Sequence, residues 1–421
     1  MLYDRWREIV RASPDEIALR DLPAARQWTF AELDHAAQTR ESNELITFPR
    51  GSGAEFILSV LRAWRHGQIT CPLESNQPPP DFPTPPTHIV HLKFTSATSG
   101  APKLVAFTAE QLAADAGNIV TTMGLRREWP NLAFISLAHS YGFSNLITPL
   151  LLHGIPLVLA GAPLPEIVRR AAIQFDSVIL PAVPALWRAW SDANAIPNSV
   201  RLAISAGAPL PLSLEREIFE KFDLKVHNFY GASECGGIAY DRTKTPRDDS
   251  ACVGTAMANV SLSINSHGCL EVRGRSVSEG YWPEMVCSRA DSVYVTSDLA
   301  ELNDGAVFLR GRASDVINVA GRKVSPETIE RSLANHPAVR DCLVFGVPSS
   351  DAERGETIVA CVVRRNGAGA EELRQFLLAS SESWQTPREF WFVDSLEANQ
   401  RGKLSRAEWR TRYRERQRDN R

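Results

Sequence analysis

The segment Phe94-Thr95-Ser96-Ala97-Thr98-Ser99-Gly100-Ala101-Pro102-Lys103 is the most informative stretch of this chain. Small hydroxylated side chains, a glycine and a lysine follow a predicted strand at 89–92. Hydroxyl groups and exposed backbone N–H groups in such a loop can surround phosphate oxygens, and the lysine adds a positive charge. The segment lacks the GxxxxGK[ST] pattern of a P-loop. Taken alone, it is consistent with a phosphate-binding loop or with an ordinary turn.

Further motifs accompany this loop in a fixed order along the chain. They are WTFAEL at 28–33, LRA through Gly67 to PL at 61–73, HSYG at 139–142, SAGAPL at 205–210, NFYGASE at 228–234, TSD at 296–298, a segment from Gly311-Arg312 to Glu330, and NQRGKLSR at 399–406. In content and order this series resembles the motifs of the adenylate-forming superfamily, which contains acyl-CoA synthetases, peptide-synthetase adenylation domains and luciferase-like enzymes. By this resemblance the chain is identified as a compact member of that superfamily.

The pattern of apolar residues predicts an α/β fold, because short apolar runs alternate with amphipathic segments. Strands are predicted at 133–137, 156–159, 177–180 and 201–205, and helices at 165–174 and 212–222. From about residue 250, shorter strands with Gly and Asn/Asp turns predict a small antiparallel subdomain. We expect a large N-terminal domain of helix-covered sheets over 1–311, followed by a small, mobile α+β domain over 312–421.

The resemblance implies an ATP site. Its phosphate-binding residues would be Thr95, Ser96, Thr98, Ser99, Gly100 and Lys103. Adenine would lie between the ring of Tyr230 and the loop Gly207-Ala208-Pro209. Asp298 would accept hydrogen bonds from the ribose hydroxyls, with Arg312 as an additional donor. The set is completed by Asn228, Gly231 and Ser233.

Three residues are implied to be catalytic. Lys403 would neutralise negative charge as a carboxylate attacks the α-phosphorus of ATP. Glu234 would hold Mg²⁺, which binds through one or two carboxylates together with phosphate oxygens. His139 belongs to the aromatic motif beside the acid pocket, although a histidine in this position is also consistent with a core residue.

The implied acid pocket is lined by Tyr141, Phe143, Trp187 and Ile238, which suit an aromatic or aliphatic acid. The stretch 132–150 contains no Asp or Glu. This disfavours an α-amino acid, because a buried ammonium without a partner is costly. The sequence does not distinguish an aryl acid from a fatty acid.

The expected activity is ATP-dependent conversion of a carboxylic acid to acyl-AMP with release of pyrophosphate. Transfer to the pantetheine thiol of CoA or of an acyl carrier protein would follow, through a channel lined by Gly321. The arginine-rich segment 406–421 is either a solvated terminal helix or a docking site for an acidic carrier. Alternatives are an enzyme that stops at the adenylate and a catalytically silent member that binds nucleotide or acyl groups. The presence of Lys403, Glu234 and Asp298 disfavours the silent member.

Composition excludes several other classes of protein. The net charge of -3 disfavours a nucleic-acid binder. The 7 cysteines form no CxxC pair, which is unlike a metal-binding framework and suits a reducing compartment. No apolar segment has the pattern of a signal peptide or a membrane span, so we expect a cytoplasmic protein without membrane insertion. Ser314 occupies a hinge position where the family often has Asp or Lys, and the short link from Leu73 to Phe94 predicts a reduced N-terminal subdomain.

Overall fold

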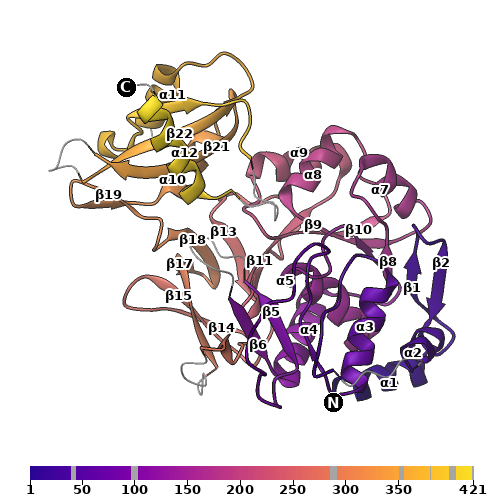
Figure 1. Cartoon of the computed structure of the whole chain (residues 1–421). Helices are drawn as coiled ribbons and strands as arrows, with labels where there is room; N and C mark the ends of the chain where they lie inside the picture. The colour runs from indigo at the N-terminus through magenta and orange to yellow at the C-terminus, as the bar shows by residue number, and fades with distance from the viewer. Residues whose placement is uncertain are drawn as a thin grey trace.

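The computed structural model describes residues 1–38, 44–95, 103–284, 292–349, 355–379, 381–397 and 404–419. A large part, indigo to salmon in Figure 1, is joined to a smaller orange-to-yellow part formed by the C-terminal residues. The predicted fold class is confirmed: helix-covered sheets, an antiparallel extension and a small α+β part. Among the described residues, no helix combines the length and the apolar composition needed to cross a bilayer.

The centre of the large part is a run of parallel strands within a 13-stranded sheet. In spatial order these are β11 (Val226–Ala232), β10 (Val200–Ser205), β9 (Val178–Ala182), β7 (Asn131–Ala133), β8 (Leu157–Leu159) and β1 (Ile17–Asp21), with β2 (Arg26–Thr29) antiparallel at the edge. All five residues of β9 are buried, as expected for a parallel strand that helices cover on both faces.

Three of the four strands predicted for this region correspond to β8, β9 and β10. The strand predicted at 133–137 is instead β7, which ends at Ala133. Asn131 is buried inside β7 because its side-chain amide donates to the carbonyl oxygen of Asn145 at 3.2 Å. The apolar pattern could not show that a polar residue begins this strand.

Helices cover both faces of the parallel strands. On one face lie α7 (Pro165–Ala172), α8 (Pro184–Asp192) and α9 (Leu212–Phe222), seen together at the upper right of Figure 1. On the other face lie α1 (Leu2–Ala12), α2 (Phe30–Gln38), α3 (Ala54–Arg65), α4 (Ala109–Met123) and α6 (Thr148–His153). Along β8, Val158 packs with the first group, whereas Leu157 and Leu159 pack with the second. The helices predicted at 165–174 and 212–222 correspond to α7 and α9.

The antiparallel extension begins earlier than residue 250. From β11 outward it contains β12 (Gly236–Tyr240), β13 (Cys252–Ala256), β18 (Ala306–Arg312), β17 (Val293–Asn303), β15 (Cys269–Arg273) and β14 (Ser261–Ile264). β12 is fully buried and therefore lacks the alternating pattern by which half-buried antiparallel strands are recognised. Gly236, with φ +74°, opens β12 and lets the chain reverse after β11.

A second sheet carries Phe94 and Leu104, on either side of the predicted phosphate-binding segment. Its strands are β16 (Gly280–Trp282), β6 (Leu104–Phe107), β5 (His91–Phe94), β4 (Ile69–Thr70) and β3 (Ile46–Thr47). β5 and β6 are antiparallel and flank the loop, with Phe94 opposite Leu104. β16 pairs with β6 and brings Tyr281 opposite Val105.

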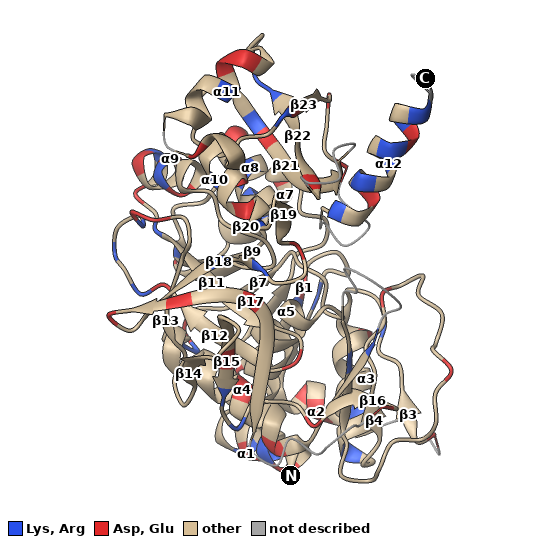
Figure 2. Ribbon diagram, turned by 90° about the vertical axis from the view of Figure 1, so that its left-hand side faces the viewer, with Lys and Arg blue, Asp and Glu red and all other residues tan. Residues whose placement is uncertain are grey.

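The C-terminal part has hydrophobic cores of its own, which contain no described residue before Ile317. Its strands are β19 (Ile317–Val319), β20 (Arg322–Val324), β21 (Val339–Pro348), β22 (Glu356–Arg364) and β23 (Glu389–Phe392), and its helices are α10 (Pro326–Ala334), α11 (Ala370–Leu378) and α12 (Arg406–Asp419). Figure 2 shows α12 at the edge of the molecule, with basic and acidic residues interspersed along it.

Arg406, the first residue of α12, holds this helix against the segment that opens the C-terminal part. Its guanidinium lies 2.8 Å from Asp315 Oδ2, 2.8 Å from Glu327 Oε1 and 2.6 Å from Glu330 Oε2. At Gly311, φ is +131° and an added Cβ would stand 2.1 Å from the Ser325 hydroxyl oxygen. The chain is therefore closely packed at Gly311, where the C-terminal part begins, and ion pairs of Arg406 connect this region to α12.

A buried network of four charges connects α9 with the start of β11. Lys225 donates to Glu215 and, at 2.5 Å, to Asp241 Oδ2. Arg247 Nε donates to Glu215 Oε2 at 2.9 Å, and Arg247 Nη2 donates to the carbonyl oxygen of Leu210 at 2.8 Å. All four charged side chains are buried. Two positive and two negative charges balance, which is the condition under which buried charges are tolerated.

We predict that Glu215→Gln lowers the free energy of unfolding by about 3 kcal/mol, because it leaves Lys225 and Arg247 with one carboxylate instead of two. Urea denaturation followed by circular dichroism measures this. Glu220→Gln, an exposed substitution on the same helix, is the matched control and should leave the midpoint unchanged. Equal stability of the two variants would contradict the prediction.

Candidate functional site

The predicted site residues follow the carboxyl ends of the parallel strands. β10 leads directly into the exposed loop Gly207–Ala208–Pro209, and β11 carries Asn228, Tyr230 and Gly231 before Ser233 and Glu234. His139 follows β7 by a short connection. Because the carboxyl ends of parallel strands meet at one edge of a sheet, these motifs converge there.

Tyr230, Asp298 and Arg312 form one hydrogen-bonded group. The Tyr230 hydroxyl donates to Asp298 Oδ2, and Arg312 Nε donates to Asp298 Oδ1 at 3.3 Å. Asp298 and Arg312 are opposite each other in the β17–β18 pairing. Burial, and next the Asp298 carboxylate, raise the pKa of Tyr230, so its hydroxyl remains a donor at neutral pH. An aromatic ring, a carboxylate and a guanidinium therefore lie together.

Glu234 is connected to Lys103 through Tyr281. The Tyr281 hydroxyl donates to Glu234 Oε1 at 2.8 Å, and the Lys103 ammonium lies 5.0 Å from the centroid of the Tyr281 ring. Thr95 and Lys103 lie together at the two ends of the loop, where Thr95 N–H donates to the Lys103 carbonyl at 2.8 Å and Lys103 N–H donates to the Thr95 hydroxyl at 3.2 Å. The predicted residues Ser96, Thr98, Ser99, Gly100 and Lys403 lie outside the described residues.

No sequence motif indicates a role for Tyr281. It reaches Glu234 because β16 leaves the antiparallel extension and pairs with β6 of the second sheet. Such a pairing joins distant segments, so no local spacing of residues could have identified it.

The motif at 139–142 forms the short helix α5 (Ser140–Gly142), and His139 caps its start. His139 Nδ1 accepts a hydrogen bond from the backbone N–H of Tyr141 at 3.3 Å. The Ser140 hydroxyl donates to the Ser233 hydroxyl oxygen at 3.1 Å, which joins this motif to the turn that carries Glu234. His139 is half-buried, so part of its ring is exposed although Nδ1 accepts the capping hydrogen bond.

The four residues predicted to line the acid pocket differ in their exposure. Tyr141 is half-buried and its hydroxyl donates to the Ile204 carbonyl at 3.4 Å. Phe143 is 1% exposed and stacks on His91, whereas Trp187 and Ile238 are fully buried in hydrophobic clusters. The structure thus places Phe143, Trp187 and Ile238 in the core instead of on an open wall. Their sequence pattern is the same in both situations, because large apolar side chains form cores and pockets alike.

Gly321, the predicted residue of the thiol channel, lies in the turn between β19 and β20 with φ +79°. It is exposed, and an added Cβ would have no neighbour within 4 Å. The Ser314 hydroxyl, at the predicted hinge, donates to Asp315 Oδ1 at 3.1 Å.

A buried lysine and a buried aspartate that sequence reasoning missed lie next to these motifs. Lys93 Nζ donates to the Ser144 hydroxyl oxygen at 3.1 Å and lies 3.9 Å from Asp115 Oδ2. Ser144 donates to the same Asp115 oxygen at 2.7 Å, and the backbone N–H of Gly237 donates to Asp115 Oδ1 at 3.0 Å. A carboxylate therefore reaches the stretch 132–150, which has none of its own, but both of its oxygens already accept hydrogen bonds.

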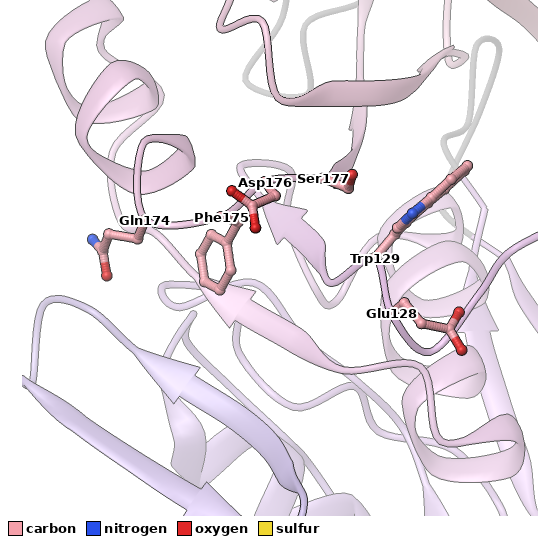
Figure 3. Close-up of a pocket in the computed structure, with 6 residues that line it drawn as sticks. All are labelled: Glu128, Trp129, Gln174, Phe175, Asp176 and Ser177. Atoms are coloured by element: carbon pink, nitrogen blue, oxygen red, sulfur yellow. The ribbon is translucent and has the colours of Figure 1, made fainter.

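Figure 3 shows a surface pocket at a different place, lined by Glu128, Trp129 and residues 174–177. Glu128 and Trp129 precede β7, and residues 174–177 precede β9. The pocket therefore lies at the amino ends of the parallel strands. Ligands of open α/β sheets bind at the opposite, carboxyl edge, where the predicted residues gather.

The described residues can contribute to a magnesium site through Glu234. Within them, no three His, Cys, Asp or Glu side chains gather in a group that could hold a metal ion. A single carboxylate fits Mg²⁺ that is bound mainly by substrate phosphates, which is the usual arrangement in nucleotide sites.

Comparisons with known proteins identify the family of this chain. The profile of the AMP-binding enzyme family matches residues 44–282, and that of the AMP-binding enzyme C-terminal domain matches residues 328–403. A feruloyl-CoA synthase from Amycolatopsis sp is 27% identical over 407 residues, which cover 91% of this chain and 81% of the relative. A 4-coumarate–CoA ligase from Nicotiana tabacum is 26% identical over 79% of this chain and 66% of the relative. A long-chain-fatty-acid–CoA ligase from Bacillus subtilis is 24% identical over 76% of this chain and 61% of the relative.

Solved structures share the fold over nearly the whole chain. ATP-bound MatB from Rhodopseudomonas palustris superposes with a TM-score of 0.86 at 19% identity, covering 98% of both chains. The o-succinylbenzoate CoA synthetase from Bacillus subtilis gives a TM-score of 0.80 at 21% identity, covering 96% of this chain and 97% of the other. With a family profile that matches more than half of its length, and a second profile that matches its C-terminal part, this chain belongs to the AMP-binding enzyme family.

Proposed function

We propose that this protein activates an aromatic or fatty carboxylic acid with ATP, forming acyl-AMP and pyrophosphate, and then transfers the acyl group to the pantetheine thiol of CoA or of an acyl carrier protein. The observation that carries the proposal is a pair of contacts on one short segment: Tyr230 joins Asp298 and Arg312, and four residues later Glu234 joins Tyr281, whose ring lies near Lys103. The named relatives are CoA synthetases and ligases, and the chain is an AMP-forming acid–thiol ligase of the same family.

In the first half-reaction, a carboxylate oxygen attacks the α-phosphorus of ATP and pyrophosphate leaves. Adenine would stack on Tyr230, against the exposed Gly207–Ala208–Pro209 loop. Asp298 would accept from the ribose hydroxyls, for which its present partners Tyr230 and Arg312 orient it. Lys103 would contact the phosphates, and Mg²⁺ held through Glu234 would neutralise part of their charge.

Lys403 would stabilise the charge that develops during this attack. It precedes Arg406 by three positions, and Arg406 is fixed to Asp315, Glu327 and Glu330. The anchoring of Arg406 supports the proposal, because it fixes the chain three residues after Lys403 to Asp315, close to the start of the C-terminal part.

The substrate class rests on two kinds of support. The relatives are named for ferulate, 4-coumarate and long-chain fatty acids, all of which are apolar carboxylic acids without an α-amino group. In this chain Asp115 reaches the 132–150 stretch, but it is buried and already paired with Lys93. Glu74 also reaches this stretch, where it accepts a hydrogen bond from the Ser136 hydroxyl at 2.7 Å, but Glu74 is exposed and offers no buried carboxylate. A substrate ammonium would therefore have to compete with the Lys93 ammonium for Asp115.

The first prediction from the proposed function concerns pyrophosphate release. With ATP, Mg²⁺ and a panel of hydroxycinnamic, benzoic and C4–C16 fatty acids, we expect release that depends on one acid class. Lys403→Ala should slow it roughly 10²-fold or more, because it removes charge stabilisation from the transition state. Lys244→Ala, which replaces an exposed lysine in a loop of the large part, should retain the wild-type rate. The absence of release with every acid would refute the proposed activity.

The second prediction separates the thiol step from adenylation. Gly321→Ala should slow formation of the acyl-thioester, measured by mass spectrometry with CoA or a carrier protein, and leave acid-dependent pyrophosphate exchange unchanged. The substitution strains a residue at φ +79° and adds a methyl group where the thiol would pass. Gly305→Ala is the matched control, because φ is +78° and the space is equally open in the β17–β18 turn. An equal effect of both substitutions would contradict a role of Gly321 in the channel.

The third prediction concerns Tyr281. Tyr281→Phe removes the hydrogen bond to Glu234 and should raise the Mg²⁺ concentration needed for half-maximal pyrophosphate release roughly tenfold, since a hydrogen bond to a charged group contributes about 1.5–3 kcal/mol. Tyr413→Phe removes a comparable hydrogen bond to Glu389 in the C-terminal part. This control variant should keep the wild-type Mg²⁺ requirement, and the same requirement in Tyr281→Phe would count against the role of Tyr281.

A further inference from the structure

Lys93, Asp115, Ser144 and the backbone N–H of Gly237 form a buried network, which we call the Lys93 network. Lys93 lies on β5, two residues before Thr95. Ser144 lies on the π-helix (Phe143–Ile147) that follows the His139 motif, and Gly237 follows Glu234 by three residues. Asp115, on α4, contacts the last two of these segments directly. Three segments that each carry a motif of the proposed nucleotide site therefore meet at one charge pair.

Lys93 and Asp115 carry opposite charges and are both buried. Lys93 is 4% exposed and Asp115 is 3% exposed. Burial lowers the pKa of Lys93, and the Asp115 carboxylate opposes that change. The ammonium also lies over the Phe107 ring, 4.6 Å from its centroid. Because neither side chain has access to solvent, removal of one would leave the other as an uncompensated buried charge.

Asp115 also defines the turn that carries Glu234. A Cβ at position 236 would stand 2.0 Å from Asp115 Oδ1, so the carboxylate packs directly against this backbone. Its hydrogen bond to Gly237 N–H fixes the next residue as well, at 3.0 Å. The position of Glu234 relative to β5, and thus to Thr95 and Lys103, depends on this contact.

We propose that Lys93 and Asp115 are positioning residues, which hold the Glu234 turn at a fixed place relative to Thr95 and Lys103, so that affinity for MgATP depends on a buried charge pair that touches no substrate. The inference rests on the proposed function only in taking Glu234 and Lys103 to bind the metal and the phosphates. Outer partners of metal-binding groups commonly change affinity by roughly 10–100-fold when they are replaced.

The test uses binding, which requires no acid substrate. Isothermal titration of the full chain with ATP, at a series of Mg²⁺ concentrations, gives the Kd for MgATP and the Mg²⁺ requirement. Asp115→Asn and Lys93→Met should each raise the Kd roughly tenfold and shift the Mg²⁺ requirement upward. The double variant should be less than additive, because it removes both charges together.

The matched control is Asp34→Asn. Asp34 is also a buried aspartate, and it accepts hydrogen bonds from Trp6 Nε1 at 2.9 Å and from the Tyr3 hydroxyl at 2.8 Å, in the α1–α2 region. It should lower the unfolding temperature without changing the Kd for MgATP. Ser144→Ala, which removes only the bridging hydroxyl, provides a milder variant if Asp115→Asn and Lys93→Met do not fold; it should raise the Kd in the same direction.

Folded variants of the Lys93 network that bind MgATP as the wild type does, or that are weakened no more than Asp34→Asn, would overturn the inference. A wild-type protein that binds MgATP but releases no pyrophosphate with any acid would refute the proposed function alone, and the binding comparison would still decide the role of the network. A wild-type protein that does not bind MgATP would overturn both.

Discussion

The contact between the Asp115 carboxylate and the backbone of Gly236 is the constraint on which the site depends. The positive φ and the absence of space for a side chain both require glycine at this position. The reversal that glycine permits turns β11 into β12 and changes the sheet from parallel to antiparallel. Because Tyr230 lies on β11 and Glu234 lies in the reversal, one turn of the backbone places both the adenine-stacking and the metal-binding candidates.

Buried charges hold both neighbours of β11. The buried network of Glu215, Lys225, Asp241 and Arg247 fixes the carbonyl of Leu210, directly after the exposed loop at 207–209 that follows β10. The Lys93 network fixes Gly237 at the start of β12. Hydrophobic burial is not directional, so the large apolar clusters alone would not define the distance between these loops. Hydrogen bonds between charged groups require specific distances and angles. Here they fix the loops on the two sides of β11, the strand that carries Tyr230.

The parts of this structure that could be predicted from sequence are those with local patterns. α7 and α9 follow from amphipathic spacing, β9 and β10 from continuous apolar runs, and the nucleotide-binding candidates from ordered motifs. The predicted start of the antiparallel region, near residue 250, misses β12, because this strand is completely buried and lacks an alternating pattern. The contacts of Asp115 and Tyr281 were missed because their partners are 122 and 47 residues away, and only the folded chain brings them together.

Few residues separate the proposed nucleotide site from the contacts that hold Arg406. Arg312 contacts Asp298 in the large part, and only three positions later Asp315 binds Arg406. On the other side of Gly311, Leu309 accepts a hydrogen bond from Arg331 of α10 at 2.8 Å. A backbone rotation near Gly311 would break this hydrogen bond and would move α10, Asp315 and Arg406 as one group, since Arg406 also binds Glu327 and Glu330 of that helix. The Lys93 network lies wholly in the large part and would not be disturbed. Under the proposed function, adenylation and thiol transfer would use one fixed nucleotide site and differ in which residues of the C-terminal part face it.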